Sequence, residues 1–315
     1  MILSSLLCNT AHIMADTTDK KSITIVGAGN MGKALAASLF SSSTRDIPIE
    51  LNLIDPMFRA VPDVGDQCIS SLKDTLAAAA TDPESTIASY SSVEDFVTHN
   101  VSNKSDIVVI AVKPQLAAEV LPTLSPITDK ESTVISLMAG VACARIDQLL
   151  HAPRLAIIRA MPNLAVQYGG GITTIFFTGE TPSKSVQEAR WLLGLGGRII
   201  VASEERLVDA ATAISGSGPG FLFHLLEGAF QEICALGFTA AQGKELIHET
   251  LKGSALLYEN AEISLPELEA QVTSPQGTTA AGVEILKRDT AQATIQECLR
   301  RAMQRSIELG KEHKD

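Results

Sequence analysis

The sequence predicts an α/β protein in which a doubly wound parallel sheet is followed by an all-helical domain. The chain has 315 residues, enough for about two domains. As far as Ser203, short apolar segments rich in β-branched residues alternate with helical segments. That alternation is typical of a parallel sheet covered by helices on both faces. Beyond Ser203 the strand signals stop and only helical patterns remain.

The composition is that of an ordinary globular protein with an acidic surface. Hydrophobic residues make up 45% of the chain and charged residues 19%, which excludes a disordered polar chain. The formal net charge is −11, which argues against a nucleic-acid partner and against an anionic membrane surface. No apolar run approaches the length that a membrane-spanning helix needs. We therefore expect neither nucleic acid nor a membrane as a partner.

The cysteines and the first residues bear on the compartment. The five cysteines are far apart and include no C-x-x-C pair, and no H-E-x-x-H occurs, so we expect neither a disulfide framework nor a metal site. The short apolar run at the start lacks the positive charge of a signal peptide. We expect residues 1–21 to be a disordered tail, with Met14 as an alternative start, and we expect a cytoplasmic location.

The first organised segment, residues 22–40, has the pattern of a strand, a glycine turn and a helix. Its turn, GAGNMG, matches G-x-G-x-x-G. The first glycine makes the tight turn, the second lets the backbone approach a pyrophosphate, and the third packs the helix on the strand. The phosphates then meet the free N–H groups of the helix N-terminus. The expected dinucleotide contacts are Val26, Gly27, Ala28, Gly29, Asn30, Met31 and Gly32.

A second strand, IELNLIDP, ends at Asp55. An acidic residue at this place hydrogen-bonds the adenosine ribose and favours NAD. The alternative for Asp55 is a cap of the next segment. Because Arg59 could receive a 2′-phosphate, both NADH and NADPH stay open as the cofactor.

Further strands are expected in SDIVVIAVKPQ, STVISLMAGV, RLAIIRAMPN, GGGITTIFF and RIIVAS, with helices such as LAAEVLPTL and ARIDQLL between them. Ligands of such sheets lie at the carboxyl ends of the strands. We therefore expect further cofactor contacts from AVKP and MAGV, namely Ala111, Val112, Lys113, Pro114, Ala139 and Gly140. A solvated side chain is the alternative for Lys113. Between Pro62 and Asn103 we expect one helix, CISSLKDTLAAAA, and then a Ser/Thr-rich loop. The predicted dinucleotide-binding domain is 22–203.

Residues 204–315 form the predicted helical domain. The segment from Glu204 to Gly237 is apolar nearly all round, and such a helix must be covered on every side, most simply by a partner subunit. Thr239 with Gln242, and Ser264 with Glu267, have the spacing of capping boxes. SGSGPG does not match G-x-S-x-G, so we interpret it as a glycine-rich break between packed helices.

The stretch QVTSPQGTTAAG, residues 271–282, precedes a helical run, VEILKR. Its proline, glycine and threonines are typical of a helix start. A helix start with exposed N–H groups is also a site for a carboxylate. The residues alone therefore leave two readings open: the stretch only starts a helix, or it also holds an anion.

Five stretches together resemble the pyrroline-5-carboxylate reductase family: GAGNMG, AVKPQ, RAMPN, DAATAISGSGPGF and VTSPQGTTAAG, in the family's order between Ile23 and Glu308. The resemblance implies a Rossmann-like N-terminal domain, an all-helical dimerisation domain, and a homodimer or larger ring. It also implies the last step of proline biosynthesis, in which NADPH or NADH reduces the cyclic imine 1-pyrroline-5-carboxylate to L-proline.

The resemblance also implies site residues. Ser274 and the backbone of Gly277, Thr278 and Thr279 would hold the substrate carboxylate. The hydroxyl of Thr279 would lie near the ring nitrogen, which makes Thr279 the catalytic candidate. Glu205 matches a family position near the substrate.

Two departures from the family pattern keep other readings open. Leu164 and Ala165 stand where the family commonly has Thr-Pro, and Gln276 stands where it has glycine. Gln276 could narrow the carboxylate loop, or it could demand a different backbone, since glycine accepts a positive φ and glutamine does not. The alternatives are a 3-hydroxyacid-type dehydrogenase, with Lys244 or Lys252 as acid/base, and a dimeric nucleotide-binding homologue without turnover.

Overall fold

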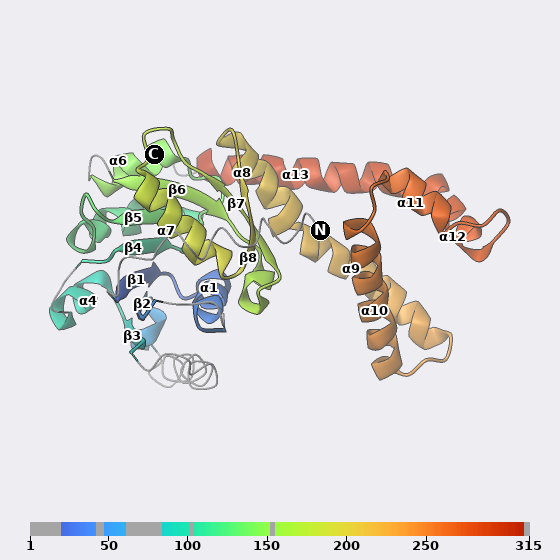
Figure 1. The fold of residues 1–315 in the computed structure, drawn as a ribbon, viewed down its shortest axis with the longest axis horizontal. Helices are drawn as coiled ribbons and strands as arrows, with labels where there is room; N and C mark the ends of the chain where they lie inside the picture. Colours follow the sequence, from blue (N-terminus) through green and yellow to red (C-terminus); the bar gives the residue numbers. More distant parts are fainter. Residues whose placement is uncertain (1–19, 42–46, 61–83, 101–103, 152–154, 312–315) are drawn as a thin grey trace. The chain divides into compact units, whose positions relative to one another are not determined.

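The computed structural model describes residues 20–41, 47–60, 84–100, 104–151 and 155–311 (Figure 1). Two compact units are found: unit 1 comprises residues 1–216 and 303–315, and unit 2 comprises residues 217–302. The sequence places the domain boundary after Ser203, and the two units divide after Gly216. The predicted helix at 68–80 and nearly all of the predicted tail lie outside the described residues.

Unit 1 contains one sheet, which in the described residues has eight strands in the order β3-β2-β1-β4-β5-β6-β7-β8. The strands are β1 (Lys21–Val26), β2 (Ile49–Ile54), β3 (Thr86–Tyr90), β4 (Ile107–Ile110), β5 (Thr133–Ser136), β6 (Ala156–Met161), β7 (Gly171–Phe176) and β8 (Gly197–Val201). Neighbours are parallel except for β6 and β7. The first six strands have the order 3-2-1-4-5-6 of dinucleotide-binding sheets. The predicted fold class is confirmed.

Strand β3 was not predicted, because the sequence favoured a loop in this region. It pairs with β2 in parallel, from Glu50 opposite Thr86 to Ile54 opposite Tyr90. No residue of β3 is fully buried, and it lies at the end of the strand order. An edge strand of this kind has little apolar pattern in its sequence, and it is stabilised by pairing with β2.

Helices and short helical turns connect the strands of unit 1. They are α1 (Asn30–Ser41), α2 (Met57–Ala60), α4 (Val93–His99), η1 (Pro114–Leu116), α5 (Ala117–Val120), η2 (Leu121–Ile127), α6 (Cys143–Leu150), η3 (Leu164–Tyr168), α7 (Ser183–Gly194), α8 (Arg206–Ala211) and the π-helical turn η4 (Thr212–Gly216). The predicted helix LAAEVLPTL is broken into α5 and part of η2, where Pro122 and Pro126 cannot donate backbone hydrogen bonds.

The sheet is covered on both faces, as Figure 1 shows for the helices around it. Within β4, Ile107 and Val109 pack in one apolar cluster with α1 and α7. Val108 and Ile110 pack in another with α4, η2 and α6. Because side chains alternate between the two faces of a strand, this division gives three layers.

Unit 2 is helical. It contains α9 (Gly218–Ala235), α10 (Ala240–Glu259), α11 (Leu265–Gln271), α12 (Thr278–Arg288) and the first part of α13 (Ala291–Lys311), whose last part belongs to unit 1. Both predicted capping boxes are present, at Thr239 with Gln242 and at Ser264 with Glu267. None of the described helices is long and apolar enough to cross a membrane.

Helix α9 is apolar and uncovered in the single chain. None of its residues is buried, and Phe223 and Leu225 are 66% and 65% exposed. The predicted need for a covering partner therefore holds, since exposed apolar surface on this scale marks an interaction site.

Candidate functional site

Three loops meet at the carboxyl edge of the sheet, where β1, β4 and β5 end. The amide of Ala111 donates to the carbonyl of Val26 at 2.8 Å, and the amide of Leu137 donates to that of Ile110 at 2.9 Å. Each loop is thus bonded at its first residue to the end of the neighbouring strand. The loops are the glycine turn, the AVKP segment and the MAGV segment, so the structure brings the predicted cofactor residues of unit 1 together.

The glycine turn has the form that a pyrophosphate needs. Gly27 has a φ of 103°, and a Cβ there would lie 2.7 Å from the carbonyl carbon of Ala111. Only glycine accepts both conditions. A Cβ on Gly32 would strike the carbonyl oxygen of Gly27, so helix and turn are in backbone contact. At Gly29, by contrast, nothing lies within 4 Å of a Cβ, which leaves open space at the expected approach of the phosphates.

Helix α1 begins at Asn30, directly after this open space. Its first turn contains no acidic side chain. The N–H groups of Asn30, Met31 and Gly32 have no acceptor within the helix, as in every first turn, and they carry the positive end of the helix dipole. The residues present therefore fit a dinucleotide pyrophosphate.

Asp55 lies beside the glycine turn. Its Oδ2 accepts a 2.7 Å hydrogen bond from the amide of Ala28, and its Oδ1 accepts one of 2.9 Å from the amide of Met57. Asp55 thus does cap the next segment, which was the alternative reading. The same bonds fix its negative charge against the cofactor loop.

The AVKP segment follows β4. Ala111 and Val112 are half-buried against Gly27, whereas Lys113 is exposed. Pro114 begins η1, where its missing N–H costs no hydrogen bond. The backbone of this segment, rather than the lysine side chain, therefore faces the glycine turn.

The MAGV segment connects β5 to α6. Gly140 has a φ of 75°, and Ala139 beside it is half-buried. The first amide of α6, on Cys143, donates to Glu205 Oε1 at 2.7 Å. Glu205, predicted to bind substrate, therefore holds the end of this segment with one carboxylate oxygen.

The same oxygen of Glu205 also accepts from Arg159. The Nη1 atom of Arg159 lies 3.1 Å from it, and Nη2 lies 2.9 Å from Asp209 Oδ1. The sequence analysis did not single out Arg159 or Asp209. A signal was present, because an arginine at a central strand position is rarely buried without a charged partner.

The thiol of Cys143 is affected by this cluster. Burial, followed by the negative charge and hydrogen bond of Glu205, raises the pKa of Cys143 to about 12. The thiol is therefore protonated and unreactive at neutral pH. This agrees with the absence of any catalytic thiol among the predicted residues.

The substrate candidates of unit 2 gather at the N-terminus of α12. Gly277 is the N-cap, and Thr278 and Thr279 are the first helical residues. No side chain caps the helix, its first turn has no acidic residue, and Lys287 and Arg288 lie in its last turn. The N–H groups of Thr278 and Thr279 are thus free of helical acceptors and suited to a carboxylate.

Ser274 and Gln276 shape the turn before α12. The amide of Gly277 donates to the Ser274 carbonyl at 3.0 Å, and a Cβ on Gly277 would strike Ser274 Oγ. Gln276 has a φ of 58°. The expectation that glutamine avoids a positive φ is therefore wrong here: Gln276 takes the left-handed conformation that glycine favours, at a cost in strain.

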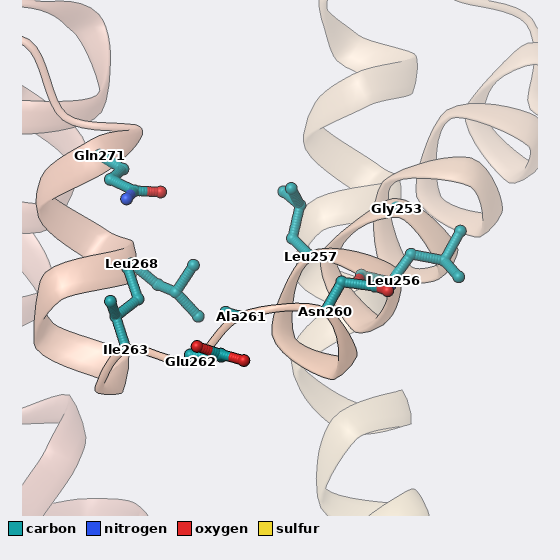
Figure 2. Close-up of a pocket in the computed structure, with 9 residues that line it drawn as sticks. All are labelled: Gly253, Leu256, Leu257, Asn260, Ala261, Glu262, Ile263, Leu268 and Gln271. Carbon is teal, nitrogen blue, oxygen red and sulfur yellow. The ribbon is translucent and has the colours of Figure 1, made fainter. Parts of the chain in front are cut away.

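A separate hollow of about 720 Å³ lies in unit 2, between the end of α10 and α11 (Figure 2). Figure 2 shows Leu257 on α10 and Leu268 on α11 on its two sides, with Glu262 in the connection. None of the predicted substrate residues lines it.

Among the described residues, no group of three or more His, Cys, Asp or Glu side chains could hold a metal ion.

Two family models match the chain. The model described as pyrroline-5-carboxylate reductase dimerisation matches residues 205–309, and the model described as ketopantoate reductase PanE/ApbA matches residues 23–184. The second match ends within the dinucleotide-binding part. The first covers α12 and most of the helical part.

Relatives with the name of this family match the chain, one of them over nearly its full length, and a solved structure shares its fold. The pyrroline-5-carboxylate reductase of Aquifex aeolicus is 30% identical over 285 residues, which are 90% of this chain and 96% of that protein. The enzyme of that name from Synechocystis is 35% identical over 210 residues, 67% of this chain and 77% of that protein. The crystal structure of pyrroline carboxylate reductase from Plasmodium falciparum with NADP bound has a TM-score of 0.75 at 23% identity, covering 92% of this chain and 98% of that one. At that identity the last comparison concerns the fold.

Proposed function

This chain belongs to the pyrroline-5-carboxylate reductase family, and from that membership we infer that it is an NAD(P)H-dependent oxidoreductase that reduces the C=N bond of 1-pyrroline-5-carboxylate to give L-proline. The observation that carries this inference is a match to the family over 90% of the chain, including the helix start that suits a carboxylate. The predicted family, enzyme class and cofactor class are all confirmed.

The cofactor is NADPH or NADH, and its place is the carboxyl edge of the sheet in unit 1. When bound, reduced nicotinamide supplies the hydride for the reaction. The first turn of α1 and the open space at Gly29 support a pyrophosphate site there. Asp55 would hold the adenosine ribose, and the backbone of the AVKP and MAGV segments would line the rest of the cofactor.

The substrate carboxylate would bind at the N-terminus of α12. The amides of Gly277, Thr278 and Thr279 and the hydroxyl of Ser274 would hold it, because an anion is stabilised where unpaired N–H groups and the positive helix end coincide. The exposed side chains of Ser274 and Thr279 leave this helix start open to a ligand.

Thr279 would orient the ring nitrogen. A threonine hydroxyl is too weak an acid to protonate the imine outright, but it can donate a hydrogen bond and relay a proton from water. A protonated or hydrogen-bonded cyclic imine is already electrophilic. The protein then has mainly to align two ligands and to stabilise the charge that changes at nitrogen.

Glu205 would contact the substrate through the oxygen that Cys143 and Arg159 leave free. Its Oε1 is held by both of those residues, and its side chain is 29% exposed. A carboxylate fixed in this way keeps one acceptor oxygen for the substrate.

The chain is expected to work as a homo-oligomer, since the matched model is a dimerisation domain and α9 is uncovered in the single chain. A homodimer, or a larger ring built from it, is the specific assembly that we propose.

We also propose a cytoplasmic location, because the cysteines within the described residues, Cys143, Cys234 and Cys298, are all free. The net charge of −11 supports the expectation that nucleic acid is not a partner.

A substrate panel tests the function. The full-length protein is incubated with NADH or NADPH and 1-pyrroline-5-carboxylate, and the loss of reduced-nicotinamide absorbance is followed. The same protein is assayed with ketopantoate and reduced cofactor, and with 3-hydroxyacids and oxidised cofactor. We expect turnover only with the cyclic imine.

The two other readings from the sequence have distinct outcomes in this panel. Turnover of 3-hydroxyacids would support a dehydrogenase, although Lys244 is exposed and Lys252 lies 3.5 Å from Glu249 on an exposed helix face. Cofactor binding without turnover of any substrate would support a non-catalytic homologue.

A further inference from the structure

The cofactor loop of Ala139 and Gly140 is in direct backbone contact with the end of α13. A Cβ on Gly140 would strike the carbonyl oxygen of Ser306, and a Cβ on Gly310 would strike the carbonyl oxygen of Gly140. Ser306 and Gly310 are one helical turn apart on α13 and belong to unit 1, as does the loop. No side chain separates the two backbones at this point.

A second connection joins the same turn of α13 to the far end of the loop. Ser306 Oγ donates to Asp209 Oδ1 at 3.3 Å, and the same oxygen accepts from Arg159. Arg159 in turn bonds to Glu205, which accepts from the amide of Cys143 where α6 begins. The polar chain therefore runs from α13 to the residue at which the loop ends.

The residues at the centre of these connections are buried, whereas the side chains of Glu205 and Asp209 are partly exposed. Ser306 is 2% exposed and Arg159 is 1% exposed. Both Nη atoms of Arg159 are paired, and only its Nε has no hydrogen-bond partner. Displacing the paired buried groups would leave them unpaired in a medium of low dielectric constant, which opposes movement. The loop is consequently held at its middle by backbone contact and at its end by the polar chain.

We propose that the turn of α13 from Ser306 to Gly310 is a positioning element for the cofactor loop Ala139–Gly140. The proposal rests on the proposed function, in which this loop contacts the cofactor. Ser306 and Gly310 act from behind the loop and touch neither ligand, so they are positioning residues rather than catalytic ones. Their effect is on where the loop backbone lies when the cofactor binds.

The test uses the full-length protein with Gly310→Ala. The added methyl group meets backbone atoms of Gly140 that cannot rotate away, so the loop must shift. We expect the Kd and KM for the reduced cofactor to rise about tenfold, since displacements near 1 Å from a remote mutation can cost up to about a hundredfold in rate. The KM for 1-pyrroline-5-carboxylate should stay within about twofold, because that ligand's carboxylate is held elsewhere.

The matched control is Gly194→Ala. Gly194 also lies in a helix of unit 1, and its Cβ would meet only Ile199 Cδ1, at 3.7 Å. Both variants replace a helical glycine by alanine, which favours the helix by up to about 1 kcal/mol. Gly194→Ala should leave the Kd for the cofactor unchanged.

Cofactor affinity is measured by titration of nicotinamide fluorescence without substrate, and hydrogen exchange of a peptide covering residues 137–143 is followed by mass spectrometry. In Gly310→Ala, exchange should accelerate about tenfold in that peptide and not in strands β1 and β2. A merely structural role for α13 would instead accelerate exchange throughout unit 1 and lower the melting temperature without a selective change in cofactor affinity.

Unchanged cofactor affinity and unchanged exchange at 137–143 in Gly310→Ala would overturn the proposal. If that variant does not fold, Ser306→Ala takes its place, because it removes the buried hydroxyl without adding volume. It should give the same local acceleration at 137–143, and no local change would overturn the proposal equally. If the wild-type protein shows no turnover but Gly310→Ala still weakens cofactor binding, the proposed function is contradicted and the positioning role of α13 is supported.

Discussion

The Nη2 atom of Arg159 lies 2.9 Å from Oδ1 of Asp209, and the arginine side chain is only 2% exposed. The pair joins β6 to α8. Glu205 is a second carboxylate partner, so a single guanidinium is paired with two carboxylates. The stability of this corner of unit 1 therefore depends on one buried cation.

Removal of that cation should be strongly destabilising. Arg159→Met leaves two carboxylates without their partner, and breaking a buried ion pair in this way costs about 3 to 5 kcal/mol. Urea denaturation of the variant should show a loss of that size. Asp209→Asn is the control, since it keeps an oxygen acceptor for Arg159 and removes one negative charge from the cluster. It should lower the free energy of unfolding less than Arg159→Met does. A loss below about 1 kcal/mol for Arg159→Met would show that the network does not stabilise the fold.

Cys143 should resist alkylation. Its pKa is raised to about 12 by burial and by Glu205, so little thiolate exists at pH 8. Iodoacetamide at pH 8, read by mass spectrometry, should label Cys143 far more slowly in the folded protein than in protein unfolded in urea. Labelling of Cys143 at the same rate in the folded and the unfolded protein would contradict this.

The same thiol makes stability fall in alkaline solution. The unfolded chain ionises Cys143 near the usual thiol pKa, whereas the folded chain keeps it protonated up to about pH 12. Between these values the unfolded state binds fewer protons, so the free energy of unfolding decreases as pH rises. Cys143→Ala should flatten this slope above pH 9 in denaturant titrations. An unchanged slope in the variant would exclude the thiol as its source.

Much of unit 1 could be predicted because its signals are local. The turn at Gly27 is specified by Gly27 and Gly32, where a Cβ would strike backbone atoms, and the strands are largely continuous apolar runs. Strand β3 could not be predicted, because its identity comes from pairing with β2 rather than from its own residues. The link from Ser306 to Cys143 could not be predicted either, since it joins residues from four separate parts of the chain.

The start of α12 was predictable as a helix N-terminus, but its backbone was not. The pattern at 271–282 left an anion site open as one reading, and the structure confirms a helix that begins at Thr278 without a side-chain cap. The positive φ of Gln276 depends on how the turn closes between Ser274 and Gly277. Residue type alone predicted a negative φ.

Gln276→Gly should therefore stabilise the protein. A left-handed conformation costs a residue with a side chain about 1 to 2 kcal/mol relative to glycine, part of which the larger entropy of unfolded glycine offsets. We expect a net gain of about 0.5 to 1 kcal/mol in denaturant titrations. Gln276→Ala, which keeps the strain, serves as the control and should show no gain. A loss of stability in Gln276→Gly would mean that the side chain itself stabilises the turn.

Asp55 should favour NADH over NADPH. Its carboxylate is fixed by the amides of Ala28 and Met57, and a 2′-phosphate would bring further negative charge beside it. We expect kcat/KM to be about tenfold higher with NADH, and we expect Asp55→Asn to reduce that ratio toward one. Steady-state kinetics with both cofactors give the ratios. A wild-type preference for NADPH that Asp55→Asn does not alter would contradict this role.

Thr279 should affect turnover and not cofactor binding. Thr279→Ala removes the hydroxyl proposed to orient the ring nitrogen, and loss of such a donor lowers kcat by about 10². Thr279→Ser keeps the hydroxyl and should restore most of the rate. The Kd for NADH should be the same in all three proteins. Unchanged turnover in Thr279→Ala would remove Thr279 from the mechanism.

The most direct test of the central claim is the stoichiometry of product and cofactor. The full-length protein is supplied with 1-pyrroline-5-carboxylate and a limiting amount of NADH, and the L-proline formed is quantified by chromatography against the NADH consumed. The account predicts one L-proline for each NADH oxidised. Bound NADH that stays reduced in the presence of the cyclic imine, with no proline formed, would contradict it.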